Sequence, residues 1–344
     1  MMHDHKVPAT YREGKKSFRL SGKRGRALDI CATLNHEYIC CNIHVLRAVS
    51  NCPYDCSYCF LQNYLTDHQT TVVADIDALM SEVTALTTAY PRRFFRIGTW
   101  ELGDSLALEE QSGCASALVK AFARLPNALL ELKTKSACVN RLLDIEHNGR
   151  TVVSWSLNPE RIIRQDEHKT AHLSERLLAM SKVCGAGYPV GLHFDPMIVY
   201  DGWEQDYQEL VETVFSTLPT ERIAWISIGS LRFNPEMKKL IEYNFPKTRI
   251  TSAEMILGGD NKVRYVKPLR ITMYKHLYDS IIKYGKSGPF VYLCMERWDV
   301  WEKIFGHSPR SINHLDYLIT SSLHLRFPGL VHEAPELSLY DTNA

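Results

Sequence analysis

The sequence has no long apolar segment and almost no net charge. No run of apolar residues approaches the roughly 18 to 20 that a transmembrane helix needs, and the first residues are charged where a secretory signal would be apolar. We therefore expect a cytoplasmic protein without a membrane partner. The formal net charge of +1 gives the whole molecule no attraction to nucleic acid, so any such contact must come from a local patch.

A disulfide framework, internal repeats and low-complexity blocks are also missing. The 10 cysteines are unevenly spaced, and 344 residues with 45% hydrophobic composition can bury a large core without cross-links. We therefore expect reduced thiols, three of them clustered in one segment, in a folded, monomeric protein.

The chain divides into three expected segments. Residues 1–38 form a basic N-terminal arm, because eight Lys or Arg residues face only two acidic residues within the first 26 positions. Such an arm is expected to be poorly structured, whether it contacts a partner or is only a solvated tail. Residues 39–251 form a barrel, and residues 252–344 form a segment that covers one of its mouths.

Apolar, β-rich runs alternate with stretches of helical period after the arm, which indicates a chain of βα units. Parallel strands joined by helices bury both faces of their sheet and place ligand sites at the carboxyl ends of the strands, as in a full or partial barrel. The six predicted strands are 42–49, 94–100, 128–133, 151–157, 190–198 and 223–231. The predicted helices are 75–88, 112–123, 173–184, 203–215 and 235–243, with a short helix between 138 and 143, and a further apolar run, 290–294, lies in the C-terminal segment.

Three cysteines lie close together directly after the first predicted strand. Cys52, Cys56 and Cys59 have the spacing C-x3-C-x2-C, and three thiolates on one tight loop can bind three irons of a 4Fe-4S cubane and leave the fourth iron open. In radical S-adenosylmethionine (SAM) enzymes that iron binds SAM, whose reductive cleavage gives a 5'-deoxyadenosyl radical. The alternatives are chance clustering and structural zinc, which normally requires a fourth ligand, and His68 is poorly spaced for that role.

The segment NCPYDCSYCFLQ, residues 51–62, resembles the cluster loop of the spore photoproduct lyase family of radical SAM enzymes. The segments RIGTWELGDSLALE, LELKTKS, VVSWSLNP, AGYPVGLHFDPM and YLCMERWDVWEKIFG resemble other parts of a lyase-like branch of that family. The resemblance implies an α/β fold, a partial (β/α)6 TIM-like barrel, with a 4Fe-4S cluster, bound SAM and an electron donor such as flavodoxin or ferredoxin. It also implies that Lys135 or Lys133, and Ser156 with Asn158, contact SAM through its carboxylate and ribose hydroxyls.

The sequence departs from the family where a hydrogen atom is returned to the substrate. In authentic lyases a cysteine just after the second strand donates this hydrogen. Here residues 98–109 contain no cysteine, and Gly103 or Asp104 takes the expected position. Cys114 and Cys138 lie beyond their strands and are not obvious substitutes.

The family's relay also uses tyrosines on both sides of the last cluster cysteine. Tyr58 precedes Cys59 and is a candidate catalytic residue, but Phe60 follows it and has no hydroxyl hydrogen to give. We therefore expect initial hydrogen abstraction without the known dimer-repair relay, and consumption of SAM. Glu101 and Asp104 are candidate acids, bases or substrate-orienting groups, unless they cap the next helix.

Candidate substrate residues follow the later strands. His193 and Asp195 alternate along the fifth strand and share one face, where they need a ligand or a hydrogen-bond partner. Arg232 can clamp an anion or form a structural ion pair. The segment 260–286, which includes Lys275, interleaves cations with tyrosines, as nucleic-acid contacts or a helix with inward-packed tyrosines would.

The leading hypothesis is a lyase-like radical enzyme that abstracts hydrogen from a nucleic acid or nucleotide. One alternative is the same radical initiation on a peptide or a small metabolite. Another is a non-catalytic iron-sulfur or zinc protein.

Overall fold

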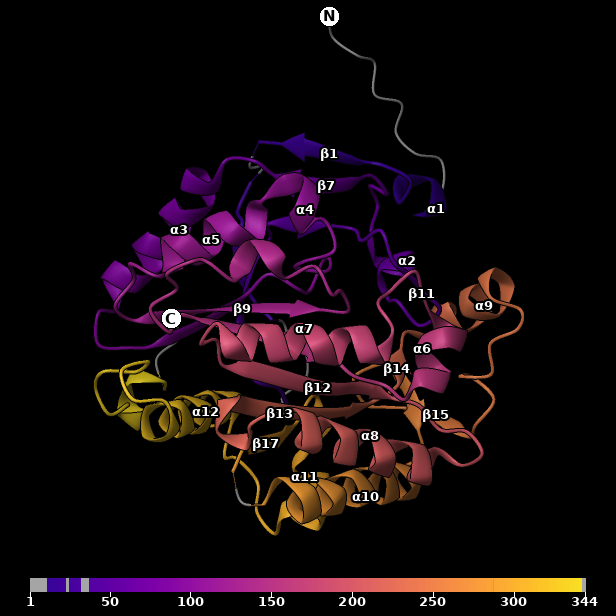
Figure 1. The fold of residues 1–344 in the computed structure, drawn as a ribbon. Coiled ribbons are helices and arrows are strands. Elements are labelled where there is room, and N and C mark those ends of the chain that lie inside the picture. The colour runs from indigo at the N-terminus through magenta and orange to yellow at the C-terminus, as the bar shows by residue number, and fades with distance from the viewer. Residues whose placement is uncertain (1–10, 23–24, 32–36, 287, 342–344) are drawn as a thin grey trace, which may run out of the picture.

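The computed structural model describes residues 11–22, 25–31, 37–286 and 288–341, and a curved eight-stranded sheet runs through its centre (Figure 1). The strand order is β17-β13-β12-β10-β9-β8-β4-β2. All pairings from β17 to β4 are parallel, and β2 joins β4 antiparallel. The strands are β2 (Leu28–Ile30), β4 (His44–Leu46), β8 (Phe95–Gly98), β9 (Ala128–Thr134), β10 (Thr151–Ser156), β12 (Val190–Met197), β13 (Ile223–Ser230) and β17 (Phe290–Leu293).

The six predicted strands are confirmed, with one difference at the first. The run 42–49 is broken by a turn in which the Ala48 amide donates to the Leu46 carbonyl at 2.8 Å. Its first part is β4, and its end becomes β5 (Val49–Ser50), which pairs with β7 (Thr70–Val73) in a separate sheet. This turn directs the chain out of the barrel sheet just before the cluster cysteines.

The predicted helices form within two residues of their expected ends. Asp75 begins the first of them by accepting the Ala78 amide at 2.9 Å, as an N-cap residue does. In the described part of the chain, no helix has the length and apolar composition that a bilayer span requires. The helices are α3 (Ile76–Ala89), α5 (Cys114–Phe122), η1 (Asn140–Leu142), α7 (Leu173–Gly185), α8 (Trp203–Thr217) and α9 (Pro235–Asn244). Helices α3, α5 and α7 contact strands of the sheet, whereas α9 lies to its side (Figure 1).

The N-terminal segment is ordered where the structure describes it, so the expectation of a poorly structured arm is wrong for residues 11–22. Tyr11–Gly14 forms α1, and Phe18–Ser21 forms β1, which pairs in parallel with β7. Gly14 is needed there because a Cβ atom would lie 1.6 Å from the His68 carbonyl oxygen. The expected arm also includes residues 1–10, 23–24 and 32–36, which lie outside the described residues.

The C-terminal segment, predicted to cover one mouth of the barrel, contributes to the main sheet itself. Its run 290–294 supplies β17, an edge strand of the main sheet. Helix α12 (Ile312–Arg326) lies at the amino ends of the strands, where Arg326 donates to the Ile223 and Ala224 carbonyls at 2.8 and 3.0 Å. The carboxyl ends of the strands are therefore the ones left for a ligand site.

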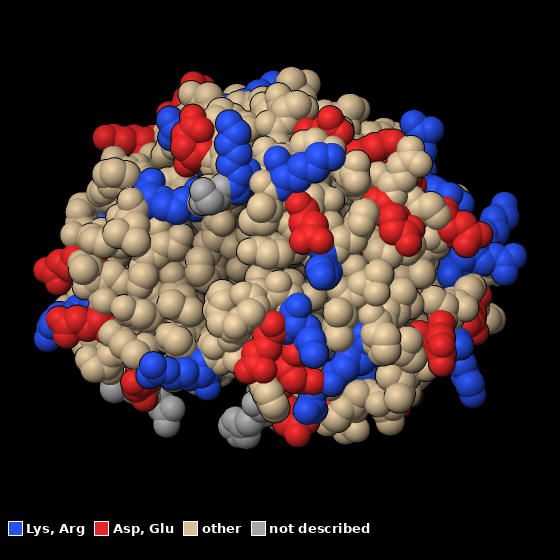
Figure 2. Space-filling model, turned by 90° about the horizontal axis from the view of Figure 1, so that it is seen from below, with Lys and Arg blue, Asp and Glu red and all other residues tan. Residues whose placement is uncertain are grey.

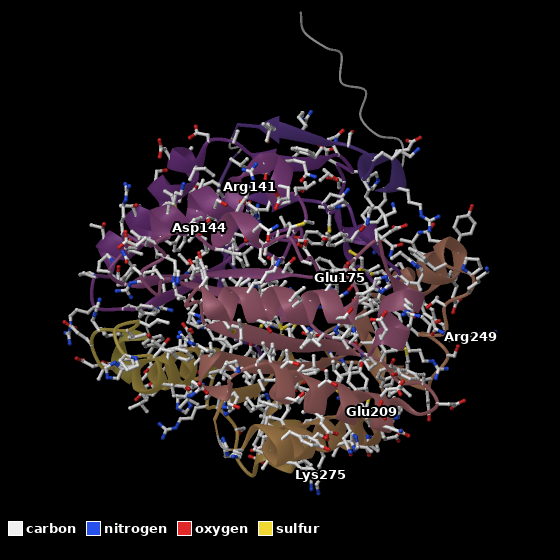
Figure 3. All side chains as sticks on the ribbon, in the orientation of Figure 1. Arg141, Asp144, Glu175, Glu209, Arg249 and Lys275 are labelled. Atoms are coloured by element: carbon white, nitrogen blue, oxygen red, sulfur yellow. The ribbon has the colours of Figure 1, made fainter. Side chains whose placement is uncertain are left out.

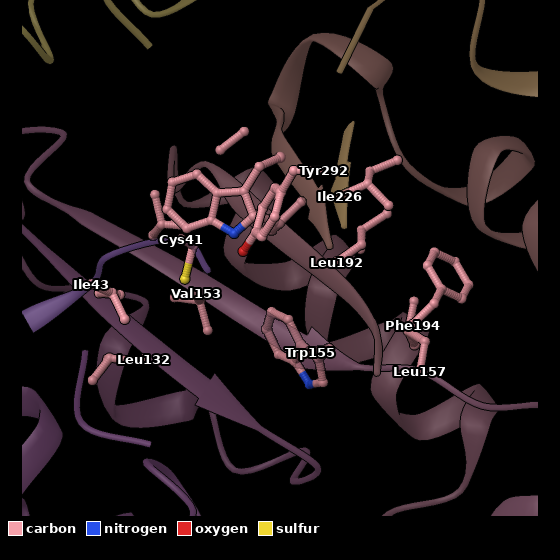
Figure 4. Packing of buried hydrophobic residues seen from close by; sticks show 14 of the residues in the cluster. Cys41, Ile43, Leu132, Val153, Trp155, Leu157, Leu192, Phe194, Ile226 and Tyr292 are labelled. Carbon is pink, nitrogen blue, oxygen red and sulfur yellow. The ribbon is translucent and has the colours of Figure 1, made fainter. Parts of the chain in front are cut away.

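The core fills the space between the sheet and its helices. Figure 4 shows Trp155, Leu192 and Tyr292 among side chains that converge from different strands. Trp155 and Leu192 are completely buried and Tyr292 is 2% exposed. A charged group accompanies this apolar packing, because Asp316 of α12 accepts a 3.0 Å bond from Nε of Arg96 and lies 3.6 Å from the Arg93 guanidinium.

Asp316→Ala is expected to lower the free energy of unfolding by about 3–5 kcal/mol, because it leaves two buried guanidinium groups without their counter-ion. Urea denaturation followed by circular dichroism measures this loss. Glu336→Ala, which breaks the exposed ion pair with Arg92, is the control and should cost less than about 1 kcal/mol. Equal losses in the two variants would contradict the role assigned to Asp316.

Candidate active site

The cluster loop begins at Asn51, which has a left-handed backbone with φ 63°. Asparagine tolerates this conformation better than most residues. Its side chain fixes the turn from both sides, since Nδ2 donates to the His68 carbonyl at 2.7 Å and Oδ1 accepts the Cys52 amide at 2.8 Å. The first cluster cysteine is thereby placed on a rigid turn.

A second anchor holds the middle of the loop. Asp55–Cys56 forms β6, which pairs antiparallel with β11 (Glu167–His168). The Ser57 amide donates to the Asp166 carbonyl at 2.8 Å, and the Ser57 hydroxyl bonds the Asp166 carboxylate at 2.6 Å. The loop is thus tied to the segment after the fourth predicted strand.

Cys52, Cys56 and Cys59 all line one cavity of about 590 Å³ at the carboxyl ends of the strands. Burial raises the pKa of the Cys52 thiol, and it raises the pKa of Cys56 to about 12 although Lys135 opposes the shift. Cys59 is half-buried and its sulfur accepts a 3.3 Å bond from the Tyr11 hydroxyl.

Three thiols on one wall of a cavity are the donor set of a cubane that keeps one iron open. Among the described residues, no three His, Cys, Asp or Glu side chains are arranged around a single ion. A cubane differs from such an ion because each of three irons takes one thiolate. The residues therefore fit a 4Fe-4S cluster.

Most of the predicted site residues line this same cavity. The lining ones are Cys52, Cys56, Tyr58, Cys59, Glu101, Asp104, Lys133, Lys135, Ser156, His193, Asp195 and Arg232.

Lys135 is held charged beside the cluster cysteines. Burial works against its charge, but Cys56 and Glu167 raise the pKa of Lys135. The Glu167 carboxylate is itself buried, and it accepts bonds from Arg176 at 2.6 Å and from the Tyr58 hydroxyl. Sequence reasoning missed Glu167, since nothing local marks a residue that acts through partners far along the chain.

The Asp104 carboxylate accepts hydrogen bonds from backbone amides of the protein. Its Oδ1 accepts the Leu106 and Ala107 amides at 3.0 and 2.9 Å, and its Oδ2 accepts the Lys135 amide at 2.7 Å. Asp104 therefore holds the turn before α4 (Glu109–Ser112) and does not cap that helix, whose N-cap residue is Leu108. Glu101 also lines the cavity, and burial raises the pKa of its carboxyl group although Arg47 opposes the shift.

His193 and Asp195 share the cavity face, as their alternation predicted, but each has its own partner. His193 Nε2 lies 2.8 Å from Glu131 Oε1, and Glu131 also accepts the Ser154 hydroxyl at 2.7 Å. Asp195 accepts two bonds from Arg232, at 2.9 and 3.1 Å. Arg232 therefore forms the ion pair that was the alternative to an anion clamp.

Two predicted residues are not in the cavity. Asn158 is 1% exposed. Its Nδ2 donates a hydrogen bond to Glu167 at 2.9 Å, and its Oδ1 accepts one from the Tyr207 hydroxyl at 2.6 Å. Lys275 is exposed on α10 (Lys267–Gly285) and projects away from the sheet (Figure 3). Its helix has a buried tyrosine, Tyr274, as the inward-packed alternative predicts.

The surface around α10 is not a basic patch either. Figure 2, which views the molecule from below, shows Lys and Arg interspersed with Asp and Glu across that face. The prediction of a nucleic-acid surface on segment 260–286 therefore finds no support outside Lys262, which lines the cavity.

A curved parallel sheet, a three-cysteine loop and a cavity at the carboxyl ends of the strands define a radical SAM enzyme. A model of the family described as spore photoproduct lyase matches residues 22–281. The chain belongs to the spore photoproduct lyase family. The predicted family, fold class and enzyme class are confirmed.

Individual relatives agree with this assignment. The chain is 27% identical over 240 residues to spore photoproduct lyase of Bacillus subtilis (strain 168), which covers 69% of this chain and 68% of the relative. It is 26% identical over 239 residues to spore photoproduct lyase of Clostridium acetobutylicum, covering 68% of each.

Solved structures share the fold. Spore photoproduct lyase complexed with dinucleoside spore photoproduct superposes with a TM-score of 0.74 at 23% identity, covering 84% of this chain and 87% of that one. A double mutant of spore photoproduct lyase with bound AdoMet and dinucleoside spore photoproduct gives the same values.

The Asp195 ion pair predicts a pH dependence of stability. Burial would raise the pKa of Asp195, but Arg232 lowers it from 3.8 to about 2. Because the folded-state pKa is the lower one, the pair stabilises the protein above pH 4 and this contribution is lost as the pH falls toward 2.

The difference in free energy of unfolding between the wild type and Asp195→Asn should therefore shrink by about 2 kcal/mol from pH 5 to pH 2. Chemical denaturation at several pH values measures it. The exposed Asp144→Asn (Figure 3) is the control and should show little difference at any pH. A difference in free energy of unfolding between the wild type and Asp195→Asn that does not change with pH would contradict the lowered pKa of Asp195.

Proposed function

We propose that this protein cleaves SAM reductively and uses the 5'-deoxyadenosyl radical to abstract hydrogen from a nucleic-acid or nucleotide substrate. The observation that carries the proposal is the convergence of Cys52, Cys56 and Cys59 with Lys135 and Ser156 on one cavity. Its volume of about 590 Å³ lies within the usual range for small-molecule sites.

A 4Fe-4S cluster on the three cysteines, when bound, supplies the electron that breaks the sulfonium bond of SAM. The chain's own residues bind SAM and orient it. Lys135, kept charged by Glu167, pairs with the methionine carboxylate, and the Ser156 hydroxyl serves the ribose. Asn158 does not line the cavity; it donates a hydrogen bond to Glu167 and so helps to hold the carboxylate that keeps Lys135 charged.

Two aromatic rings at the cavity support a nucleic-acid substrate. Phe60 and Tyr64 line the cavity, are 42% and 60% exposed, and meet edge to face with ring centroids 5.6 Å apart. Exposed rings next to a polar cavity suit the stacking of an unpaired base. The solved relatives with dinucleoside spore photoproduct agree with this substrate class.

The known hydrogen-return route does not fit this site. A Cβ atom at Gly103 would lie 2.7 Å from the Asn51 carbonyl oxygen, so a cysteine cannot occupy that position without moving the cluster loop. Asp104 is bound to backbone amides. The proposal therefore includes abstraction but not return through the family's relay.

Anaerobically reconstituted, reduced protein should release 5'-deoxyadenosine, and Cys56→Ala should abolish the release because one iron loses its ligand. Liquid chromatography measures it with and without dinucleoside spore photoproduct, which should increase the release. Cys184→Ala, whose thiol lies outside the cavity lining, should behave as the wild type. Release that survives Cys56→Ala would refute the proposal, whereas Cys56-dependent release indifferent to nucleic acid would redirect it to peptides or metabolites.

Tyr64→Ala should weaken binding of a single-stranded oligonucleotide by about 1–3 kcal/mol, the usual contribution of a stacked ring. Fluorescence anisotropy at fixed salt measures the change. Tyr243→Ala removes a ring that is 84% exposed and does not line the cavity, and it should leave binding unchanged. Equal effects of the two substitutions would exclude a stacking site at Tyr64.

A further inference from the structure

A second group of cysteines lies in the same cavity, apart from the cluster loop. Cys31, Cys40, Cys41 and Cys294 all line it. The Cys40 thiol is close enough to the other three for each of them to influence its pKa. Cys40 and Cys41 are 1% and 3% exposed, whereas Cys31 and Cys294 are half-buried and open to the cavity.

Strand pairing brings these residues together from distant parts of the sequence. β3 (Tyr38–Ile39) pairs antiparallel with β18 (Glu296–Arg297), so Cys40 leaves one strand beside the segment that contains Cys294. The Cys294 amide donates to the Ile228 carbonyl at 2.8 Å, which continues the pairing of β17 with β13. Cys294 therefore stands on the same edge of the sheet as the other site residues.

We propose that the Cys294 thiol returns a hydrogen atom to the substrate radical and that Cys40 captures the resulting sulfur radical. The inference rests on the proposed function, and it assigns the step for which the family's residues are missing here. A thiol suits this step because its S–H bond is weaker than most C–H bonds.

The step balances as follows. A C–H bond forms on the substrate radical as the S–H bond of Cys294 breaks, which leaves a thiyl radical. The thiyl sulfur bonds to the Cys40 sulfur as Cys40 releases its proton to cavity water, and this gives a disulfide radical anion. Its extra electron passes to a one-electron acceptor of the flavodoxin or ferredoxin class in its oxidised form, and a dithiol reductant later returns the disulfide to two thiols.

Among the four cysteines, Cys294 is assigned as the hydrogen-atom donor because it is accessible from the cavity and contacts Arg232. It is open to the cavity, and the Arg232 guanidinium donates a 3.6 Å bond to its sulfur, while Asp195 holds Arg232 in place. Cys40 lines the same cavity as Cys294 but is only 1% exposed, so it can resolve the radical while presenting almost no surface to the substrate. Cys114, which the sequence analysis did not favour as a substitute donor, does not line the cavity.

The first experiment examines the thiol pair without requiring turnover. The anaerobic protein is oxidised with diamide, its remaining thiols are alkylated, and its disulfides are mapped by peptide mass spectrometry. The expected product is a Cys40–Cys294 disulfide, which is absent in Cys294→Ser and retained in Cys114→Ala. Pairing of Cys40 with Cys31 instead, or no disulfide at Cys40, would overturn the assignment.

The second experiment follows the hydrogen atom. Dinucleoside spore photoproduct is turned over in D2O, where thiol hydrogens exchange with solvent, and both 5'-deoxyadenosine and deuterated product are measured. In Cys294→Ser, release of 5'-deoxyadenosine should persist while deuterated product per 5'-deoxyadenosine falls at least about tenfold. Cys114→Ala should match the wild type, and circular dichroism checks that each variant is folded.

The outcomes separate this inference from the proposed function. Unchanged deuterated product in Cys294→Ser would overturn the donor role while radical initiation stands. No 5'-deoxyadenosine from the wild type would refute the proposed function itself. If the wild type cleaves SAM but makes no product from this dinucleoside, the disulfide mapping decides whether Cys40 and Cys294 form the pair.

Discussion

The buried carboxylate of Glu167 is the interaction on which the site depends most. Its backbone pairs with Cys56, and its side chain joins the Tyr58 hydroxyl and the Arg176 guanidinium. A buried carboxylate is costly unless it is paired and hydrogen-bonded, and Glu167 is both. The same charge helps to raise the pKa of Lys135. One residue thus couples the position of the cysteine loop to the charge of Lys135, the lysine that we propose binds SAM.

The cavity contains two groups of cysteines, and different parts of the fold hold each group in place. The cluster cysteines lie on a loop fixed by Asn51 and by pairing with β11. The second group depends on pairing between β3 and β18, at the opposite ends of the catalytic region in sequence. Because the supports are separate, a change in one group need not move the other, and the proposed initiation and return steps can be altered independently.

The sequence predicted what local periodicity determines. The six central strands alternate regularly with helices, and the cysteine motif is contiguous, so both were recognisable. The role of Glu167 and the proposed roles of Cys40 and Cys294 were not, because the residues that surround them come from distant parts of the chain. Segment 260–286 left two interpretations open for a related reason, since composition does not tell which face of α10 packs inward, and Tyr274 proved to be buried.

The close approach at Gly103 also constrains how this chain can change. A side chain there meets the Asn51 carbonyl and the Val49 side chain, at 2.7 and 2.8 Å from its Cβ atom, and Asn51 sets the turn that places Cys52. A cysteine gained at Gly103 would disturb the cluster loop it was meant to serve. A hydrogen donor at Gly103 would therefore require a compensating change in the turn at Asn51.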